Sequence, residues 1–444
     1  MAAAPATRLA ALVEMLRDTQ WLPAQRLRAG QMQQLAALLQ HAFEASEFHR
    51  ERLSSVGYRR GSPVTPALLA ALPVLTRSEV QDHRAAIECR RLPAGHGEPI
   101  PIESSGSTGA PVRVLGSGLT KLFWNALTVR SHEWNRSDLK ALAAVINFFP
   151  KLPPGGARRP DWGPPMNRLF QTGPCVGMHI VTPVDVQARW LIAQQPTYLV
   201  THPTNAMALA EWFLAHGERL SHLREVRTMS EAHPADLRQA CQSAWGARVA
   251  DLYSSREAGI MAIECPHSGL YHVQSEHLIV EVLRDDGSPC EPGELGRVVV
   301  TNLHNYAFPL LRYDVGDLAE PGPPCGCGRH LPTLRRIAGR IRNMLVLPNG
   351  QTLWPSIAGL KMGRAAPIRQ FQVVQTSLRE VQVLLVADAP LDAAQAQTVR
   401  DIVAEALVHP FEITLSYRDA IPRAASGKFE EFKSLVPAPG RGTT

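Results

Sequence analysis

The segment from about residue 140 to residue 255 alternates short β-type runs with helical stretches, and this alternation constrains the fold more than any other feature. The β-type runs read AAVINFF, PTYLVTH, REVRTM and ARVADLY, and the helical stretches include Pro203 to His216 and Pro234 to Trp245. Strands that alternate with helices form βαβ units, whose strands run parallel in one sheet. We therefore expect an α/β fold built on parallel βαβ sheets.

The segments on either side of this alternation follow other patterns. Helical periodicity from about residue 8 to residue 55 predicts a helical lead-in over about 1–60. Between about 270 and 320, the runs HLIVEVL and GRVVVTNL are separated by turn residues and predict a β-rich subdomain. The Pro- and Gly-rich stretch from Lys151 to Pro165 predicts one long loop.

The end of the chain predicts a second domain. After Gly339, the strand-like runs FQVVQ, VQVLLVA and EITLSYR surround one helical stretch from Ala393 to Leu407. This pattern is typical of a small α+β domain. We expect a large N-terminal domain over 1–338 and a small C-terminal domain over 339–444.

Composition narrows the class of protein. The 444 residues are 45 % apolar and 19 % charged, which is typical of a soluble globular protein. The net charge of +6 comes from scattered basic residues, so no nucleic-acid partner is expected. The first helical stretch contains charged residues and no apolar run reaches about 18 residues, so we expect neither a signal peptide nor a membrane contact. Seven cysteines, an odd number, fit a reducing cytoplasm.

A Ser- and Gly-rich segment, SSGSTGAP, covers Ser104 to Pro111. Backbone amides freed by glycine, interleaved with hydroxyls, can surround phosphate oxygens. It is not a Walker loop, because no Gly-Lys-Ser/Thr follows. A flexible surface turn is the alternative interpretation of this segment alone.

A second motif, DLYSSREAG, covers Asp251 to Gly259 and follows a predicted strand. At the carboxyl end of a strand, the ring of Tyr253 could pack on a nucleotide base and the carboxylate of Glu257 could hold Mg²⁺. A structural turn between strand and helix is the alternative.

Three further motifs are unremarkable one by one: LRYDVGD at 311–317, GRIRNM at 339–344 and PRAASGK at 422–428. The last contains Lys428, one of only six lysines in a chain that otherwise uses arginine. A compact ammonium and a planar guanidinium are not interchangeable, so this lysine is a candidate for a special role.

In this order and at these intervals, the five motifs resemble those of the adenylate-forming superfamily of acyl- and aryl-CoA ligases, most closely its phenylacetate-CoA ligase and capsule-biosynthesis-like branch. The resemblance runs from about Leu72 to Phe432. It implies that a carboxylate attacks the α-phosphate of ATP, that pyrophosphate leaves, and that a thiol, commonly that of CoA, takes the acyl group. It also implies that the small C-terminal domain moves between these half-reactions.

The resemblance assigns roles to individual residues. Lys428 would bridge the carboxylate and the α-phosphate, and Glu257 would ligate Mg²⁺. Asp317 would accept hydrogen bonds from the ribose hydroxyls, Arg340 would contact the ribose or phosphates, and Arg342 would be the hinge. The remaining ATP- and AMP-binding residues would be Ser105, Ser107, Thr108 and Gly109 at the pyrophosphate end, and Tyr253 with Ser254 at the adenine.

Three positions depart from the family's pattern. Ala110 stands where a lysine is common in the phosphate loop, and Arg256 stands where threonine or serine usually precedes the acidic residue. Arg342 and Asn343 stand where the hinge is usually acidic. We expect adenylation to survive these changes.

Two clusters of cysteine and histidine suggest a metal. Cys265 and His272 lie in CPHSGLYH, and Cys325 and Cys327 lie in CGC. Four such ligands suit tetrahedral Zn²⁺, and a closed four-ligand site is structural. Some members of the branch are similar in carrying a structural zinc at such positions. His267 is a rival for the fourth ligand, and reduced cysteines at a turn are the alternative.

The leading hypothesis is an ATP-dependent ligase that forms an acyl adenylate and then an acyl-CoA thioester. The same first step could serve a carrier-protein thiol or an amine, and a non-catalytic, zinc-stabilised binding protein is the alternative class. Phe148 and Phe149 favour an aromatic or apolar acid, unless they are core residues. We expect the acid pocket near these rings and the segments Gln171–His179, Met229–Glu231 and Ser254–Gly259. Relatives often form homodimers.

Overall fold

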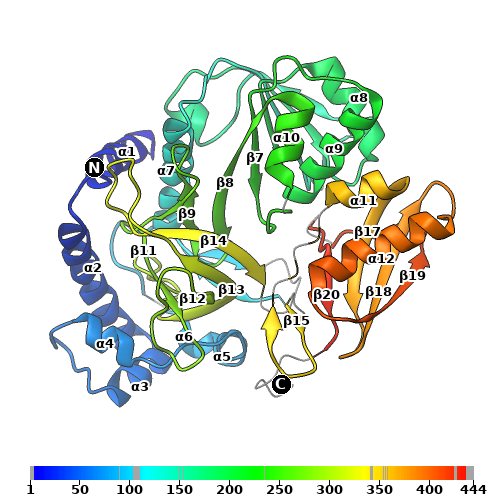
Figure 1. The fold of residues 1–444 in the computed structure, drawn as a ribbon. Helices are drawn as coiled ribbons and strands as arrows, with labels where there is room; N and C mark the ends of the chain where they lie inside the picture. The colour runs from blue at the N-terminus through cyan, green and yellow to red at the C-terminus, as the bar shows by residue number, and fades with distance from the viewer. Residues whose placement is uncertain are drawn as a thin grey trace. The chain divides into compact units, whose positions relative to one another are not determined.

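The structure is a computed structural model that describes residues 5–89, 91–103, 111–149, 151–153, 155–234, 236–340, 344–353, 355, 357, 359–424 and 428–436. It forms two compact units (Figure 1). Unit 1 comprises Met1–Leu139, Gly163–Gln171 and Asp251–Ala338, and unit 2 comprises Lys140–Trp162, Thr172–Ala250 and Gly339–Thr444. One boundary between the units falls directly before Gly339, while the two-domain division at that position stays a prediction.

Unit 1 begins with the predicted helical lead-in. Its helices are α1 (Pro5–Thr19), α2 (Ala24–Ala45) and α3 (Glu47–Ser55). Three short helices follow it, α4 (Pro66–Ala71), α5 (Arg77–Asp82) and α6 (Arg84–Ile87). One face of α2 is buried through Leu35, Leu38 and Leu39, as the helical spacing of these residues predicts. The side chain of Ser46 then accepts a hydrogen bond from the backbone of His49 and starts α3.

The sheet of unit 1 follows the order β11-β12-β13-β14-β10-β9-β8. Its strands are β8 (Arg248–Ser255), β9 (Gly259–Glu264), β10 (Tyr271–Val273), β11 (Leu278–Leu283), β12 (Gly296–Asn302), β13 (Tyr313–Pro321) and β14 (Thr333–Arg340). Antiparallel pairing joins β8 with β9, β9 with β10, β10 with β14, β11 with β12, and β12 with β13. The predicted β-rich subdomain is therefore confirmed.

The remaining elements of unit 1 are the antiparallel pair β1 (Ile100–Glu103) and β2 (Arg113–Gly116), helix α7 (Gly118–Trp134) and the short 3₁₀ helix Met166–Arg168. The motif residue Arg312 has a structural part in this unit. Its buried guanidinium pairs with Glu281 at 3.0 Å and donates to the carbonyl oxygens of Ala70 and Leu72. These contacts connect the start of β13 to the C-terminal end of α4.

Unit 2 contains the predicted parallel sheet, in the order β7-β6-β3-β5-β4. Its strands are β3 (Ala143–Asn147), β4 (Ala157–Arg159), β5 (Cys175–His179), β6 (Tyr198–Thr201) and β7 (Glu225–Met229). The pairs of β3 with β5, β3 with β6 and β6 with β7 are parallel. Helices α8 (Val184–Gln194), α9 (Pro203–His216) and α10 (Leu237–Trp245) share one buried apolar core with these strands. The α/β class is confirmed.

One expectation about unit 2 is wrong in part. The stretch from Lys151 to Pro165 is not wholly a loop, because it contains β4, which pairs antiparallel with β5. The three residues of β4 are all exposed, so this edge strand carries no alternation of apolar and polar residues that the sequence could reveal.

The C-terminal part of unit 2 is a small α+β domain, as predicted. Its sheet follows the order β19-β18-β17-β20, with strands β17 (Ile368–Gln375), β18 (Glu380–Ala387), β19 (Glu412–Tyr417) and β20 (Phe432–Ser434). Helices α11 (Gly359–Ala365) and α12 (Ala393–Leu407) bury apolar residues against it. The short pair β15 (Leu345–Val346) and β16 (Thr352–Leu353) precedes them.

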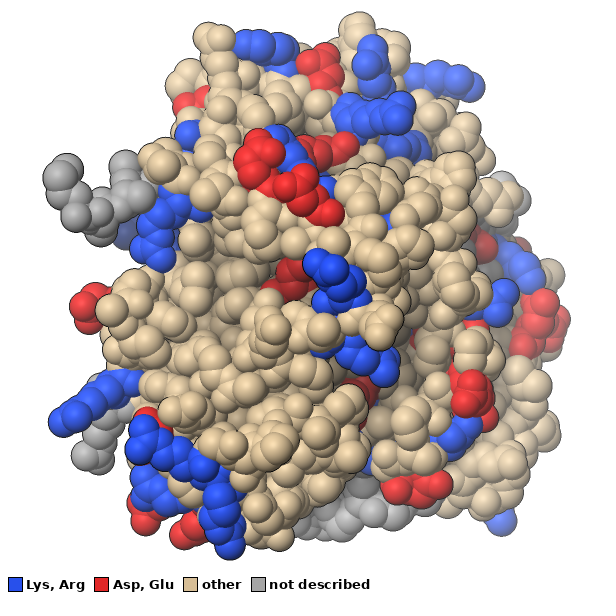
Figure 2. Space-filling view, turned by 90° about the vertical axis from the view of Figure 1, so that its left-hand side faces the viewer, with Lys and Arg blue, Asp and Glu red and all other residues tan. Residues whose placement is uncertain are grey.

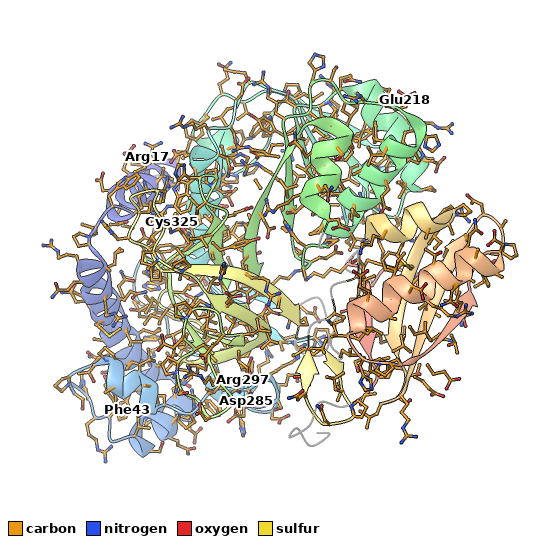
Figure 3. The ribbon with its side chains drawn as sticks, in the orientation of Figure 1. Arg17, Phe43, Glu218, Asp285, Arg297 and Cys325 are labelled. Atoms are coloured by element: carbon orange, nitrogen blue, oxygen red, sulfur yellow. The ribbon has the colours of Figure 1, made fainter. Side chains whose placement is uncertain are left out.

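Charged residues are distributed over the surface. On the face in Figure 2, basic and acidic side chains are interspersed, and wide areas carry neither. Arg297 and Asp285, labelled in Figure 3, form a 3.8 Å ion pair at the hairpin of β11 and β12. Among the described residues, no helix combines the length and the apolar character that a membrane crossing requires.

Candidate active site

Two residues predicted to bind the nucleotide are in contact inside unit 1. Tyr253 lies on β8 and Asp317 on β13, and the tyrosine hydroxyl donates a hydrogen bond of 2.8 Å to Oδ2 of Asp317. Both residues are buried, at 7 % exposure each. Before Asp317, Gly316 has a φ of +78° and its amide donates to Oδ1 of Asp314. A ring and a carboxylate from separate motifs therefore lie at one place.

The predicted magnesium ligand, Glu257, lies in the tight turn between β8 and β9. Its side chain is 5 % exposed, and its Oε1 has no hydrogen-bond partner among the described residues. The carbonyl oxygen of Ala258 faces Nε2 of His277 at 3.2 Å and accepts from Nδ2 of Asn302 at 3.0 Å, and these contacts fix the turn. A buried carboxylate oxygen with no partner fits a Mg²⁺ ligand, since this ion prefers oxygen donors.

The turn also needs its glycine. Gly259 has a φ of +88°, and a Cβ atom there would lie 2.7 Å from Nε2 of His277. Burial, with the charge of His304 adding to it, lowers the pKa of His277 to about 3. The ring is therefore neutral at physiological pH, and its Nε2–H donates a hydrogen bond to the Ala258 carbonyl oxygen.

The other predicted site residues either lie outside the described residues or are placed by their burial and a few contacts. Ser105, Ser107, Thr108, Gly109 and the hinge residue Arg342 lie outside the described residues. Ser254 is half-buried on β8, and Arg340 is half-buried at the end of β14. Arg256, which departs from the family's pattern, is exposed and donates from Nη1 to the carbonyl oxygen of Glu103 at 3.0 Å. It thereby contacts the strand that leads into the predicted phosphate loop.

In unit 2, polar residues gather where the parallel strands end. Asn147 ends β3, His179 ends β5, His202 follows β6, and Glu231 stands two residues after β7. The carboxyl edge of parallel strands is where α/β proteins bind ligands. Phe148 at this edge is 40 % exposed and meets the ring of His179 edge-on at 5.2 Å, so it is not a core residue.

We call Ala424 to Lys428 the lysine-bearing loop, of which the structure describes the two ends, Ala424 and Lys428. The residues that flank it, Arg423 and Phe429, contact this edge. The base of the loop is closed by a hydrogen bond of 2.8 Å from the amide of Ala424 to the carbonyl oxygen of Lys428. On one side of the loop, Arg423 makes an ion pair of 3.7 Å with Glu231. On the other side, the backbone amide of Phe429 donates to Oε1 of Glu231 at 2.7 Å. We did not predict this role for Glu231; the only signal is a carboxylate just after a buried strand.

A cavity of about 440 Å³ lies beside the loop in unit 2. Its lining includes Thr204, Met207, Glu211, Arg423 and Glu431. This volume lies in the range of small-molecule sites, and the walls mix apolar and ionisable side chains. The lining differs from the segments predicted for the acid pocket.

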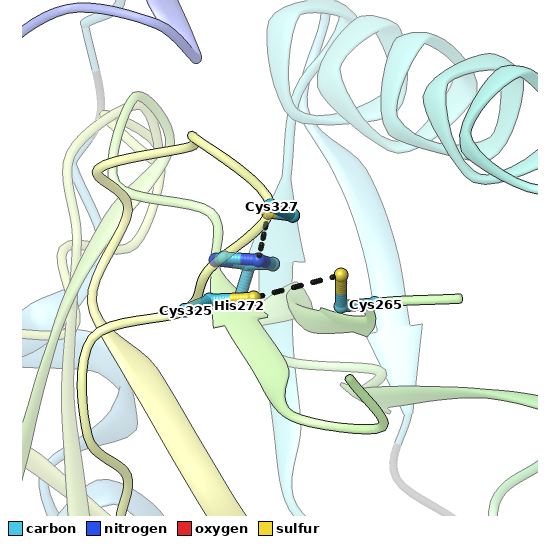
Figure 4. Close-up of side chains that lie close together, drawn as sticks. All are labelled: Cys265, His272, Cys325 and Cys327. Atoms are coloured by element: carbon cyan, nitrogen blue, oxygen red, sulfur yellow. Dashed lines mark hydrogen bonds between the residues drawn. The ribbon is translucent and has the colours of Figure 1, made fainter. Parts of the chain in front are cut away.

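Unit 1 also brings the four predicted zinc ligands together. One donor atom each from Cys265, His272, Cys325 and Cys327 lies within 4.8 Å of all the others (Figure 4). The sulfurs of Cys265 and Cys325 are 3.8 Å apart, and Sγ of Cys327 is 3.3 Å from Nε2 of His272. In a tetrahedral site with Zn–S bonds of about 2.3 Å, two sulfurs lie about 3.8 Å apart. The donor set and its spacing therefore fit zinc.

The surroundings of this cluster also suit a metal. Nδ1 of His272 faces the carbonyl oxygen of Leu331 at 3.3 Å, which leaves Nε2 toward the sulfurs. Burial opposes ionisation of Cys265, but hydrogen bonds from His272 and from the backbone of His267 and Ser268 lower its pKa to about 5. A thiolate is the form that binds zinc. The rival ligand His267 is exposed, and His272 is the histidine in the cluster.

Comparisons with known proteins found one family model and several curated proteins to which the chain is similar. Residues 360–434 match the family model of the CapK C-terminal domain. A phenylacetate-coenzyme A ligase of Thermus thermophilus is 27 % identical over 369 residues, which cover 76 % of each chain. A phenylacetate-coenzyme A ligase of Escherichia coli is 25 % identical over 345 residues, which cover 74 % of each chain.

Among solved structures, 2-hydroxyisobutyryl-CoA ligase in its postadenylation state is similar in fold. The TM-score is 0.71 at 19 % identity, over 93 % of this chain and 90 % of that chain. Anthranilate CoA ligase is similar with a TM-score of 0.53 at 17 % identity, over 82 % of this chain and 74 % of that chain. The CapK C-terminal match and the two phenylacetate-coenzyme A ligases support the adenylate-forming superfamily for this chain.

Proposed function

We propose that the protein is an ATP-dependent acid–thiol ligase, which converts a carboxylic acid to an acyl adenylate and transfers the acyl group to CoA. The observation that carries this proposal is the 2.8 Å hydrogen bond between Tyr253 and Asp317. These residues come from two motifs that were each assigned to the nucleoside of ATP, and 64 positions separate them in the chain. Their contact is what one shared nucleoside site requires.

The chemistry of the first step explains the other residues. In-line attack of a carboxylate on the α-phosphate brings two anions together, so cations and hydrogen-bond donors must stabilise the developing charge. The amine of Lys428 would lie between the two anions. Glu257 would hold a magnesium ion, which would neutralise charge on the phosphates as pyrophosphate leaves.

The second step requires a different arrangement around the acyl adenylate. A thiol must reach the acyl carbonyl carbon, next to which Lys428 would lie during the first step. The lysine-bearing loop therefore has to move away, with Arg342 as the proposed hinge. The similar 2-hydroxyisobutyryl-CoA ligase has been solved both in a postadenylation state with 2-HIB-AMP and in a thioesterification state with 2-HIB-AMP and CoA. These two states support a movement of this kind here.

We propose an aromatic or apolar acid as the substrate. The support is Phe148, whose ring is 40 % exposed at the carboxyl end of β3 instead of being packed in the core. Apolar walls with few polar groups are typical of sites for such small molecules.

We also propose that Cys265, His272, Cys325 and Cys327 hold a structural zinc ion. Zinc bound by four protein ligands has no open position for a substrate, so its contribution is to stability. The site lies on β10 and on the segments that follow β9 and β13, and it would tie these segments together.

Acid-dependent exchange of labelled pyrophosphate into ATP tests the first step, with a panel of aromatic, apolar and hydroxy acids. The proposal expects exchange with at least one aromatic or apolar acid, followed by an acyl-CoA thioester when CoA is added. If pyrophosphate exchanges but no acyl-CoA thioester forms, and the acyl group is found on a carrier-protein thiol or an amine, that group and not CoA is the acceptor. No exchange with any acid would contradict ligase activity.

A further inference from the structure

Glu231 is held from the side of the parallel sheet by residues at the start of α9. Its Oε1 faces Nδ1 of His202 at 3.1 Å, and its Oε2 accepts from the backbone amide of Thr204 at 3.1 Å and from its hydroxyl at 2.7 Å. The side chain is only 4 % exposed. Ser230 directly before it has a φ of +76°, which is uncommon for a residue with a side chain. The sheet therefore holds this carboxylate in one orientation.

The other residue that fixes this orientation is Asn147, at the end of β3. Its Oδ1 accepts from the amide of Phe148 at 2.7 Å, which identifies this atom as the oxygen. The same oxygen faces Nε2 of His202 at 3.1 Å. Both ring nitrogens of His202 thus face acceptors, and the ring joins the ends of β3 and β6 to Glu231.

The same carboxylate holds both ends of the lysine-bearing loop. Arg423 precedes the loop, pairs with Glu231 at 3.7 Å and donates to the hydroxyl of Thr204 at 3.1 Å. Phe429 directly follows Lys428, and its amide donates to Glu231 at 2.7 Å. The guanidinium of Arg423 also lies 5.6 Å from the centre of the Phe429 ring. One side chain therefore fixes the backbone immediately before and after the loop.

Glu231 is ionised, whereas one neighbouring carboxyl group, that of Glu431, is largely neutral. Burial opposes its ionisation, but His202, Arg423 and the Phe429 amide together lower the pKa of Glu231. Burial raises the pKa of Glu431 to about 8, so this neighbour is largely protonated at neutral pH. A charged acceptor makes stronger hydrogen bonds than a neutral one, which suits the contacts of Glu231 with the loop.

We propose that Glu231 is a positioning residue, which docks the lysine-bearing loop on the carboxyl edge of the parallel strands so that Lys428 is in place for adenylation. The inference rests on the proposed function for the catalytic role of Lys428. The contacts of Glu231 with Arg423 and Phe429 are given by the distances above.

Glu231 has one set of contacts with the lysine-bearing loop and another with the start of α9, which suits reversible binding of the loop. When the loop leaves, the carboxylate loses Arg423 and the Phe429 amide but keeps His202 and Thr204. A buried carboxylate without partners is costly, so the retained contacts keep the undocked state accessible. Docking would thus favour adenylation without blocking the later approach of the thiol.

The test compares the two half-reactions in the full-length Glu231→Gln variant. Glutamine has the same shape but no charge, so the loop should be less well fixed, and a misplacement of about 1 Å can cost roughly 100-fold in rate. We expect kcat of pyrophosphate exchange to fall roughly 10- to 100-fold, with KM for ATP little changed. Thioester formation from a synthetic acyl adenylate should be unchanged. Equal losses in both half-reactions, or no loss, would overturn the proposal.

Further variants separate docking from a general loss of structure. Arg423→Gln should give the same split, the double variant should be no worse than the poorer single variant, and Arg423→Lys should retain more exchange than Arg423→Gln. Fully additive losses would contradict a shared dock. Glu218→Gln is the matched control, because this glutamate is exposed just after α9 (labelled in Figure 3).

Hydrogen–deuterium exchange gives a readout that needs no activity. The Phe429 amide should be protected in the wild type and in Glu218→Gln, and it should exchange faster in Glu231→Gln. Equal protection in all three proteins would overturn the dock. If the wild type exchanges no pyrophosphate with any acid, the proposed function fails, and this measurement decides the role of Glu231 by itself.

Discussion

The hydroxyl of Tyr253 donates to Oδ2 of Asp317 at 2.8 Å, so this carboxylate is already oriented by the ring proposed to lie along the adenine. Asp317→Asn should raise KM for ATP roughly 10- to 100-fold, because hydrogen bonds to a charged group contribute about 1.5–3 kcal/mol. Tyr253→Phe keeps the ring and should raise KM less. Steady-state pyrophosphate exchange measures both values.

The matched control for this prediction is Asp285→Asn. Asp285 lies in the β11–β12 hairpin with a fully exposed side chain, and its substitution should leave KM for ATP unchanged. If Asp317→Asn binds ATP as the wild type does, the ribose is not held by this carboxylate.

Cys327→Ser should remove the bound metal and lower thermal stability together. A loss of about 3 kcal/mol would lower the Tm of a unit of this size by roughly 6–12 °C. Metal analysis and thermal unfolding of the same preparations measure the two effects, and a chelator should reproduce them in the wild type. Cys175→Ser is the control, since Cys175 lies on β5 in unit 2. Unchanged stability in wild-type protein free of zinc would argue against the metal site.

Glu431 makes stability depend on pH. Burial, with the charges of Glu231, Glu211 and Asp236 adding to it, raises its pKa from 4.5 to about 8. Between these values the unfolded chain releases the proton while the folded chain keeps it, so the free energy of unfolding falls as pH rises. Glu431→Gln should therefore unfold at a higher temperature than the wild type at pH 8 and at nearly the same temperature at pH 4.5.

The control for the pH experiment is Glu412→Gln, an exposed glutamate on β19, whose substitution should leave the pH dependence as in the wild type. A wild-type stability that rises between pH 5 and pH 8 more steeply than that of Glu431→Gln would have the wrong sign for a buried neutral acid.

Elements with strong local signals could be predicted from the sequence. Helix α12 runs from Ala393 to Leu407 as expected, and Asp392 caps it through the amide of Gln395. Helix α9 starts at Pro203 and ends before Gly217, which has a φ of +67°. Proline in the first turn and glycine after the last residue are the usual helix boundaries. In contrast, the exposed edge strand β4 has no such signal.

The candidate site likewise has one part that could be predicted from the sequence and one part that could not. The cysteine and histidine residues in two short segments predicted which four side chains lie together, because few other residue types bind zinc. The dock on Glu231 could not be predicted, since its partner is a backbone amide 198 residues further along the chain. Every residue except proline has such an amide, so the sequence holds no mark of this contact.

Lys428→Ala tests the role of the amine. Removing one preorganised charge from a transition state typically costs about 10² to 10³ in rate, so adenylation should fall by that factor. A synthetic acyl adenylate should still be converted to the thioester at the wild-type rate. Lys433→Ala, on the exposed side of β20, is the matched control.

The most direct measurement is acid-dependent exchange of labelled pyrophosphate into ATP by the wild type, Lys428→Ala and Lys433→Ala side by side. The account predicts exchange in the wild type and in Lys433→Ala, and its near loss in Lys428→Ala. A wild type that exchanges no pyrophosphate with any acid, or a Lys428→Ala variant that exchanges it as fast as the wild type, would contradict the account.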